Sequence, residues 1–159
     1  MRRLEQLRRQ LKPGTAYRRS DLAKWSKSVD RHARELVETG AYIHDIAINP
    51  DDADEIITVF SNYNIDGLFH SSDGGSTYTS IEGNLAGDTE NAGPSIRRAI
   101  ILPLDGSNIY FLATSTGLYS TSTLNGDNTV WELESADGLG NVVVEYLDIR
   151  IADKTIAVG

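Results

Sequence analysis

The sequence of 159 residues contains no cysteine and no long apolar run. The missing cysteine excludes disulfides, thiolate zinc sites and cysteine nucleophiles. A membrane-spanning helix needs about 20 consecutive apolar residues, and no stretch approaches that length. The first ten residues, MRRLEQLRRQ, have the positive start of a secretion signal but no apolar stretch behind it. We therefore expect no membrane segment and no export signal.

Basic residues are scarce after residue 41. Residues 42–159 hold four Lys and Arg against 18 Asp and Glu, a net charge of −14, whereas residues 1–41 hold 11 against five, a net charge of +6. Such a division predicts two domains, 1–41 and 42–159, with different partners. The basic domain could bind nucleic acid, which would repel the acidic one.

Residues 1–41 have the pattern of three short helices. Leucines at helical spacing among arginines predict the first helix over residues 3–11. Ser20 can cap a second helix and Ser28 a third, which stops at Gly40. Three short helices with a tight link before the third are typical of a helix-turn-helix.

A helix-turn-helix would place its third helix in the major groove of DNA. We expect Ser28, Arg31 and Arg34 to lie near base edges in that case. Arg18, Arg19, Lys24 and Lys27 would hold phosphates. The alternative is a solvated basic face on a small helical bundle.

The stretch PGTAYRRSDLA, followed by SVDRHARELVETG, resembles the N-terminal helix-turn-helix of AbiEi-type antitoxins and related regulators. The resemblance spans roughly residues 3–41 and implies a cytoplasmic DNA-binding transcriptional regulator. Members of that family usually continue into a basic β-wing, whereas this chain becomes acidic.

Residues 42–159 read as short strands separated by clusters of Asn, Asp, Gly and Pro. Strands this short and regular indicate an all-β repeat fold. The expected strands cover residues 43–48, 55–60, 67–71, 76–80, 95–102, 108–114, 117–121, 129–133, 141–149 and 154–158.

An internal repeat runs through this region. GLFHSSDGGSTY (67–78) and GLYSTSTLNGDNTVW (117–131) share a Gly-Leu-aromatic start, and Gly67 and Gly117 lie 50 residues apart. Thr129 and Trp131 close the looser second copy, and DKTIAV (153–158) opens a third. A period near 50 residues is typical of a four-stranded propeller blade.

The segment SSDGGSTY, residues 71–78, could be a catalytic acid, a cation site, a phosphate cradle or a tight turn. We favour the turn: Asp73 accepts backbone N–H groups, Gly74 and Gly75 supply positive φ, and a hydroxyl closes the loop. The pattern Ser-x-Asp-x-Gly-x-Thr-aromatic is carried by Ser71, Asp73, Gly75, Thr77 and Tyr78.

This pattern resembles the Asp-box, or BNR repeat, of sialidase-like β-propellers. Nearly all of residues 42–159 resembles the last blades of large secreted bacterial Asp-box propellers, which often end in a type IX secretion sorting domain. The resemblance implies a partial antiparallel β-propeller of about two and a half blades, with a non-catalytic scaffold or a carbohydrate- or protein-binding role. Together with the helical head, the expected fold class is α+β.

No catalytic residue, metal ligand or cofactor site is predicted. Sialidase-type catalysis needs several arginines and a Tyr–Glu pair, but residues 42–159 offer only Arg97, Arg98 and Arg150 and no recognisable Tyr–Glu pair. We expect Arg97 to pair with a nearby acid, and residues 51–55 to form an acidic surface turn. His32, His44 and His70 lack metal-ligand spacing and are expected at the surface or in packing.

The two resemblances imply different locations, the cytoplasm for the head and secretion for the propeller. An abrupt change near residues 41–42 and an end in mid-blade lead us to expect a chimeric or truncated reading frame. Its partners would be DNA, carbohydrate or protein, the missing blades, or other copies through open strand edges. A DNA-binding regulator and a fragment of a secreted glycoside hydrolase are the alternative functions.

Overall fold

The computed structural model describes residues 42–60, 66–87, 93–134 and 141–159. These residues form antiparallel β-sheets and two short 3-10 helices, η1 (Gly83–Leu85) and η2 (Ile151–Asp153), with no α-helix in the described ranges. The predicted helix-turn-helix and its candidate DNA contacts lie outside them.

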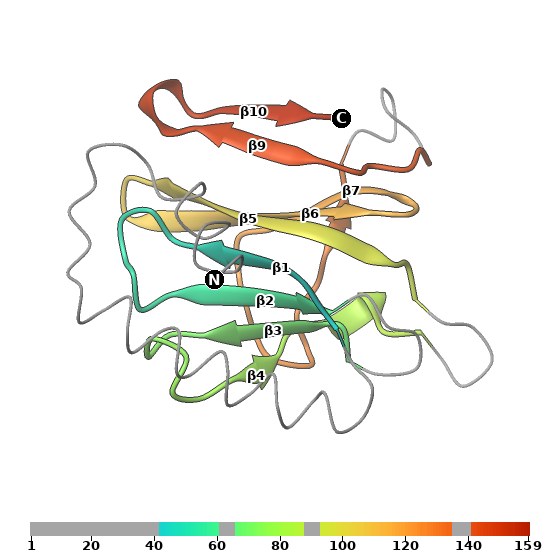
Figure 1. Cartoon of the computed structure of the whole chain (residues 1–159), viewed down its shortest axis with the longest axis horizontal. Helices are drawn as coiled ribbons and strands as arrows, with labels where there is room; N and C mark the ends of the chain where they lie inside the picture. Colours follow the sequence, from blue (N-terminus) through green and yellow to red (C-terminus); the bar gives the residue numbers. More distant parts are fainter. Residues whose placement is uncertain (1–41, 61–65, 88–92, 135–140) are drawn as a thin grey trace.

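Two four-stranded sheets and one hairpin follow each other along the chain (Figure 1). Every neighbouring pair of strands is antiparallel, and each strand pairs with the next in sequence. The first sheet contains β1 (Ile43–Ile48), β2 (Ile56–Phe60), β3 (Leu68–Ser71) and β4 (Thr79–Ser80). The second contains β5 (Ile96–Leu104), β6 (Ser107–Thr114), β7 (Gly117–Thr121) and β8 (Glu132–Leu133), and the hairpin contains β9 (Leu147–Arg150) and β10 (Thr155–Val158).

Most predicted strands are confirmed within a residue or two, but three are much shorter than predicted. In the segment predicted over 76–80, only Thr79–Ser80 is a strand, because Ser76 and Thr77 bond to Asp73 in the preceding turn. In the segment predicted over 129–133, only Glu132–Leu133 is a strand, because the backbone of Trp131 bonds to the Asn84 side chain. In the segment predicted over 141–149, the strand begins only at Leu147. The amides of Glu145 and Tyr146 there both donate to the carbonyl of Gly159, which interrupts the regular ladder.

The two four-stranded sheets share one register. Each first strand has a bulge, between Ile43 and Asp45 in β1 and between Ile96 and Arg98 in β5. After the bulge, four rows of paired residues run across the first three strands of each sheet. In the first sheet the rows are Asp45–Val59–Leu68, Ile46–Thr58–Phe69, Ala47–Ile57–His70 and Ile48–Ile56–Ser71. In the second they are Arg98–Ala113–Leu118, Ala99–Leu112–Tyr119, Ile100–Phe111–Ser120 and Ile101–Tyr110–Thr121.

The hairpin β9–β10 continues these rows. The amide of Gly159 donates to the carbonyl of Tyr146, and the carbonyl of Gly159 accepts from the amide of Tyr146. The pair Tyr146–Gly159 therefore corresponds to the pair Arg98–Ala113 of the second sheet. The next rows are Leu147–Val158, Asp148–Ala157 and Ile149–Ile156. The hairpin therefore corresponds to the first two strands of a third unit.

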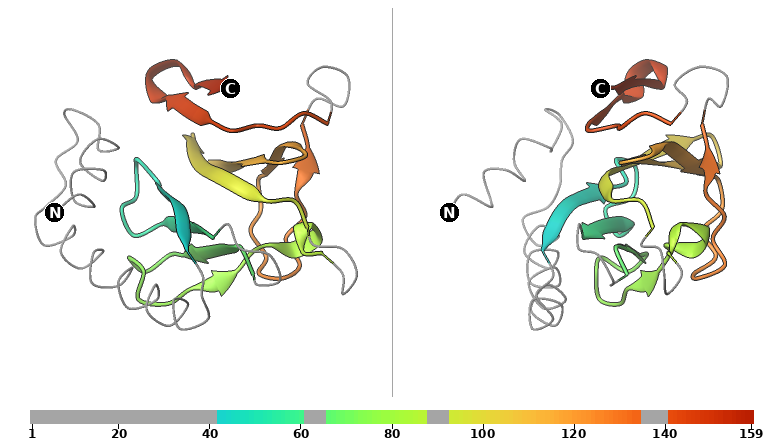
Figure 2. Two further views of the ribbon diagram at one scale, coloured as in Figure 1. Left: turned by 45° about the vertical axis from the view of Figure 1, so that its right-hand side comes forward. Right: turned by 90° about the vertical axis from the view of Figure 1, so that its right-hand side faces the viewer.

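The side chains of alternate rows point to opposite faces of a sheet, because successive side chains of a strand do so. One buried core joins the first two sheets, with the first and third rows of the first sheet against the second and fourth rows of the second. The other face of the second sheet packs on β9–β10 through Ile100, Ala113, Leu118, Val144 and Leu147. Figure 2 shows these layers from two further sides.

Candidate functional site

The loop between β3 and β4, which we call the Asp73 turn (residues 71–78), is closed by its own side chains. The amide of Thr77 donates to Asp73 Oδ1 over 2.9 Å, and the Thr77 hydroxyl donates to Oδ2 over 2.7 Å. Ser71 donates to Oδ1 over 2.8 Å and accepts from the amide of Gly75 over 2.8 Å. Oδ1 therefore binds a backbone amide and a hydroxyl of the turn, and Oδ2 binds a second hydroxyl.

The glycines in this turn adopt backbone angles that other residues rarely adopt. Gly74 has φ 69° and Gly75 has φ 79°. The amide of Gly74 donates to the carbonyl of Asp54 over 2.9 Å, so the turn lies against the acidic segment before β2. A side chain at position 74 would approach the Asp54 carboxylate at 2.9 Å, which leaves little room for one.

The electrostatics of Asp73 favour a structural role. Hydrogen bonds from the Thr77 amide, the Thr77 hydroxyl and Ser71 lower the pKa of Asp73 to about 2. Such a carboxylate stays ionised at neutral pH and has no proton to donate as a general acid. Asp73 and Thr77 are exposed, Gly75 is buried, and Tyr78 is half-buried before β4.

The equivalent turn in the second sheet has different chemistry. Thr121 Oγ1 accepts from the amide of Thr123 over 3.2 Å, as Ser71 Oγ accepts from the amide of Asp73 over 3.3 Å. Position 123 offers no carboxylate. Thr129 instead donates to the carbonyl of Gly126 over 2.7 Å and accepts from the amide of Asn125 over 2.9 Å. Gly117 is the first residue of β7.

Trp131, which ends this second turn, belongs to the core between the two sheets. Its side chain is 2% exposed, and its indole N–H donates to the carbonyl of Ile81 over 2.8 Å. The side chain of Asn84 bonds the Trp131 backbone at both ends, over 2.7 and 3.0 Å. Gly83 lies against this segment, since a Cβ on it would sit 1.9 Å from the Thr129 carbonyl oxygen.

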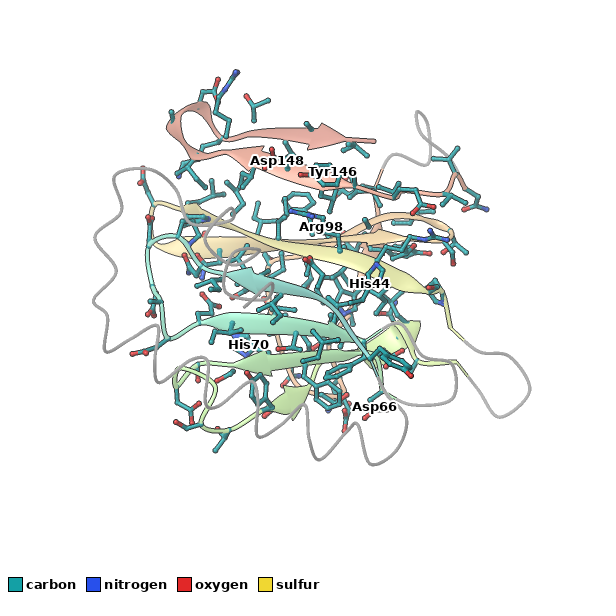
Figure 3. All side chains as sticks on the ribbon, in the orientation of Figure 1. His44, Asp66, His70, Arg98, Tyr146 and Asp148 are labelled. Carbon is teal, nitrogen blue, oxygen red and sulfur yellow. The ribbon has the colours of Figure 1, made fainter. Side chains whose placement is uncertain are left out.

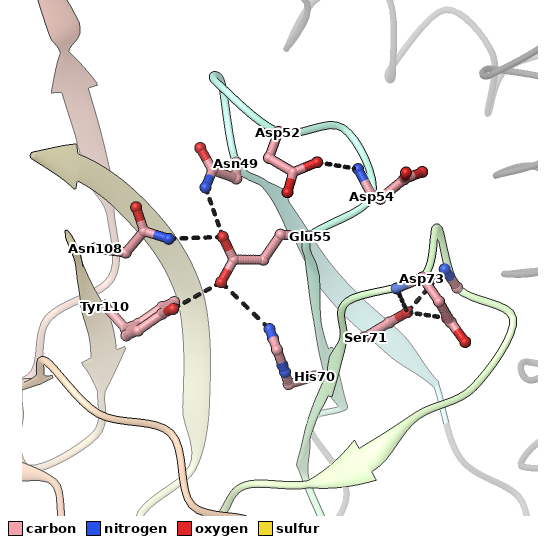
Figure 4. A network of polar contacts seen from close by, with 10 residues as sticks. Asn49, Asp52, Asp54, Glu55, His70, Ser71, Asp73, Asn108 and Tyr110 are labelled. Carbon is pink, nitrogen blue, oxygen red and sulfur yellow. Dashed lines mark hydrogen bonds and ion pairs between the residues drawn. The ribbon is translucent and has the colours of Figure 1, made fainter. Parts of the chain in front are cut away.

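A second polar cluster surrounds Glu55, just before β2 (Figure 4). Its Oε2 accepts from Asn49 over 2.5 Å and from Asn108 over 2.8 Å. Its Oε1 accepts from the Tyr110 hydroxyl over 2.6 Å and lies 3.3 Å from His70 Nε2. We call these five residues the Glu55 cluster; it joins the first sheet to β6 of the second.

The prediction of a surface turn over residues 51–55 is therefore wrong for its last member. Asp51, Asp52 and Asp54 are exposed, but Glu55 is buried. Burial alone would raise the pKa of Glu55, but hydrogen bonds from His70, Tyr110 and Asn49 outweigh it and lower the pKa to about 2. The carboxylate is thus a buried anion whose acceptor sites are occupied.

The Tyr110–Glu55 contact is a Tyr–Glu pair, which the sequence did not reveal. Its electrostatics oppose catalysis, because burial and the hydrogen bond to Glu55 raise the pKa of Tyr110 to about 12. A tyrosine nucleophile would need its proton removed easily, by a base with a pKa nearer neutrality. Both shifts instead favour a neutral phenol bonded to a charged carboxylate.

The three arginines of this region interact with other residues, and Figure 3 labels one of them, Arg98, beside Tyr146. Arg97 pairs with Glu145, which confirms the expected acid partner, and Arg150 pairs with Asp153. Arg98 lies over the Tyr146 ring, 4.3 Å from its centroid. Among the described residues, no hydrogen bond or ion pair joins these arginines to Glu55 or Tyr110.

Of the remaining predicted residues, two histidines lie in the described ranges and the others lie outside them. His44 is exposed and His70 packs in the Glu55 cluster, while Arg18, Arg19, Lys24, Lys27, Ser28, Arg31, His32 and Arg34 lie outside the described residues. Within the described ranges, no group of three His, Cys, Asp or Glu side chains is placed to hold a metal ion. No helix in the same ranges has the length and apolar character that a membrane crossing requires.

Comparison with known proteins finds no matching family, curated protein or solved structure.

The Glu55 cluster could not be predicted from the sequence because its members lie far apart in the chain. His70 lies 15 residues and Tyr110 lies 55 residues from Glu55. One signal was present: Glu55 directly precedes IITVF, in which every residue is buried. A carboxylate attached to such a strand has to find buried donors, and the partners become visible only when the second sheet is placed.

Proposed function

We propose that residues 42–159 form consecutive blades of an Asp-box β-propeller that serves as a non-catalytic scaffold for binding carbohydrate or protein. The observation that carries this proposal is the row-for-row correspondence of the two sheets and the hairpin. Repeated four-stranded antiparallel units that share one register and stack through the same faces are the construction principle of propellers.

The first strands of the three units support the same interpretation. Asp45 of β1 accepts the amide of Ala99 of β5 over 3.1 Å. Arg98 of β5 in turn lies over Tyr146, in the segment that leads into β9. Contacts between consecutive first strands are expected where blades surround a common axis.

We propose binding rather than catalysis because the carboxylate oxygens of Asp73 and Glu55 already accept hydrogen bonds within the protein. Asp73 closes a turn, and Glu55 is held by four side chains from two sheets. Each carries a lowered pKa of about 2, which suits an ionised hydrogen-bond acceptor.

A glycoside hydrolase fragment is the second candidate, and the Tyr110–Glu55 pair is the observation in its favour. A panel of fluorogenic aryl glycosides, assayed between pH 4 and 8, separates the two. The scaffold predicts no turnover above the buffer rate, with saturable binding on a glycan or peptide array. Turnover that both Glu55→Gln and Tyr110→Phe abolish, in variants that stay folded, would overturn the non-catalytic role.

The basic residues 1–41 add a proposed DNA-binding function, supported by their net charge of +6 beside the −14 of the body. Titration of a labelled duplex with the full chain should give an affinity that falls steeply with salt. Arg31→Ala combined with Arg34→Ala should weaken it, and Arg150→Ala is the matched control in the acidic body. No binding at low salt would remove this function.

A further inference from the structure

The second turn (residues 121–131) contains a dipeptide that can change chemically without an enzyme. Asparagine followed by glycine occurs once in the sequence, at Asn125–Gly126. We propose that Asn125 is a site of spontaneous deamidation, which gives this turn a negative charge and lengthens its backbone. This inference goes beyond the proposed function and does not depend on it.

The reaction needs only water and a base. The backbone nitrogen of Gly126 loses its proton to the base and attacks Cγ of Asn125, and the side-chain amide takes up a proton and leaves as ammonia. Water then opens the five-membered imide. If the bond to Cγ breaks, the product is an ordinary aspartate. If the bond to the main-chain carbonyl carbon breaks, the chain continues through Cγ as an isoaspartate.

The side chain of Asn125 is available for this reaction, whereas other asparagines are held. Asn125 is exposed, and its side chain makes no hydrogen bond to the described residues. The side-chain amides of Asn49 and Asn108 both donate to Glu55, and that of Asn84 bonds the Trp131 backbone. Those three amides would have to break these bonds before they could react.

The residue after Asn125 also permits the attack. Gly126 has no Cβ to crowd its nitrogen, and its amide donates no hydrogen bond within the part of the chain that the structure describes. Asn128 and Asn141 are exposed as well, but a threonine and a valine follow them. A β-branched side chain restricts the approach to the neighbouring nitrogen. Asn125 therefore combines a free side chain with an accessible nucleophile.

The Asp73 turn shows how a turn can block the same chemistry. Asp73 also precedes a glycine, and an aspartate can form the same imide with loss of water. Its carboxylate accepts from Ser71 and Thr77, and the amide of Gly74 donates to the carbonyl of Asp54 over 2.9 Å. Both reacting groups are thus engaged in hydrogen bonds, which the equivalent groups of Asn125 and Gly126 are not.

An isoaspartate at position 125 would loosen the second turn. The carbonyl of Asn125 accepts from the amide of Asn128 over 3.0 Å, and the amide of Asn125 donates to Thr129 Oγ1 over 2.9 Å. The isoaspartate inserts a further carbon atom into the main chain and turns the accepting carbonyl into a branching carboxylate. The amides of Asn128 and Thr129 should then exchange with solvent on the order of tenfold faster.

The test incubates the full chain at pH 8 and follows the tryptic fragment between Arg98 and Arg150 by tandem mass spectrometry. Deamidation increases the mass of a residue by about 1 Da. Asn125 should gain this mass at least about tenfold faster than Asn128, which precedes a β-branched residue. Asn125→Gln is the matched control, because it keeps an amide but disfavours the five-membered ring, and it should abolish the gain.

A peptide with the sequence of residues 121–130, TSTLNGDNTV, reports the reaction without the fold. If the peptide deamidates while the full chain keeps Asn125 intact, or reacts there no faster than at Asn128, the inference is overturned. Hydrogen exchange tests the consequence. Asn125→Asp carries the charge without the added carbon and should leave the Thr129 amide protected. The aged protein should lose that protection, and an unchanged Thr129 amide in isoaspartate-containing protein would overturn the loosening of the turn.

Discussion

The two four-stranded sheets share their register but close their last hairpins differently. The Asp73 turn is held by a carboxylate that binds the turn's own amide and hydroxyl groups. The equivalent turn has Thr123 in place of the aspartate and extends to Trp131, which lies in the core between the sheets. The first turn is ordered by its own side chains, whereas the second combines the local hydrogen bonds of Thr121 and Thr129 with packing of Trp131 between the sheets. A shared arrangement of strands therefore tolerates different turn chemistry, provided that each turn has its own source of order.

The largest effect is expected from removing the packing of the second turn. Trp131→Ala should destabilise the protein by about 3–5 kcal/mol, because a buried indole and its hydrogen bond to Ile81 are lost together. Tyr78→Ala, at the aromatic position of the Asp73 turn, should cost less because Tyr78 is half-buried. Urea unfolding measures both, and equal losses would contradict the contrast between the turns.

The next effect concerns the Glu55 cluster, which joins the two sheets. Glu55→Gln should destabilise the protein by about 1–3 kcal/mol at pH 7, because it removes the buried charge that accepts hydrogen bonds from Asn49, Asn108 and Tyr110. The folded pKa of about 2 lies below the ordinary 4.5, so the stabilisation is present above pH 4.5 and disappears as the pH falls toward 2.

The difference in stability between the native protein and Glu55→Gln should thus shrink between pH 5 and 2. Chemical unfolding at several pH values measures it. A difference independent of pH would show that Glu55 does not act as an ionised acceptor.

A more local effect is expected from Asp73→Asn. The asparagine side chain carries no charge to accept the hydrogen bonds of Thr77. The backbone amide of Thr77 should therefore exchange with solvent on the order of tenfold faster. The Thr129 amide, in the equivalent turn, should be unaffected. Because the folded pKa of Asp73 is about 2 against an ordinary 3.8, acid should release the Thr77 amide only as the pH falls through about 2. Release near pH 4 would argue against the bonds in this turn.

The smallest effect is expected where the two turns already agree. Ser71 and Thr121 hold equivalent positions, and each hydroxyl accepts the amide two residues later. Thr121→Ser keeps this acceptor and loses one buried methyl group, so it should change stability by no more than about 1 kcal/mol. Thr121→Val removes the acceptor and should cost about 1 kcal/mol more. Similar losses of stability in both variants would show that the Thr121 hydroxyl does not stabilise the turn.

The strands could be predicted from sequence because their signals are local. The isoleucine-rich segment of residues 43–48, bounded by Asn49 and Pro50, and the Gly-Leu-aromatic start of β7 each identify a strand without knowledge of any partner. The Asp73 turn was equally readable, since its acceptor, donors and glycines all lie within eight residues.

Features that depend on a second sheet could not be predicted in this way. Trp131 was predicted to lie in a strand at the end of the second repeat copy, and only its hydrogen bond to Ile81, 50 residues earlier, places it between the sheets. The late start of β9 likewise depends on Gly159, which bonds to Glu145 and Tyr146. Patterns within a sequence specify strands, whereas the pairing of distant segments decides what those strands bury.

The second unit stacks on the first through one shared core. The indole N–H of Trp131 reports on it most directly, and a Trp25→Phe variant assigns its NMR signal. Stacking predicts slow exchange of this proton with solvent and a nuclear Overhauser contact to Ile81. Exchange at the rate of a free indole, with no contact to Ile81, would contradict the stacked units.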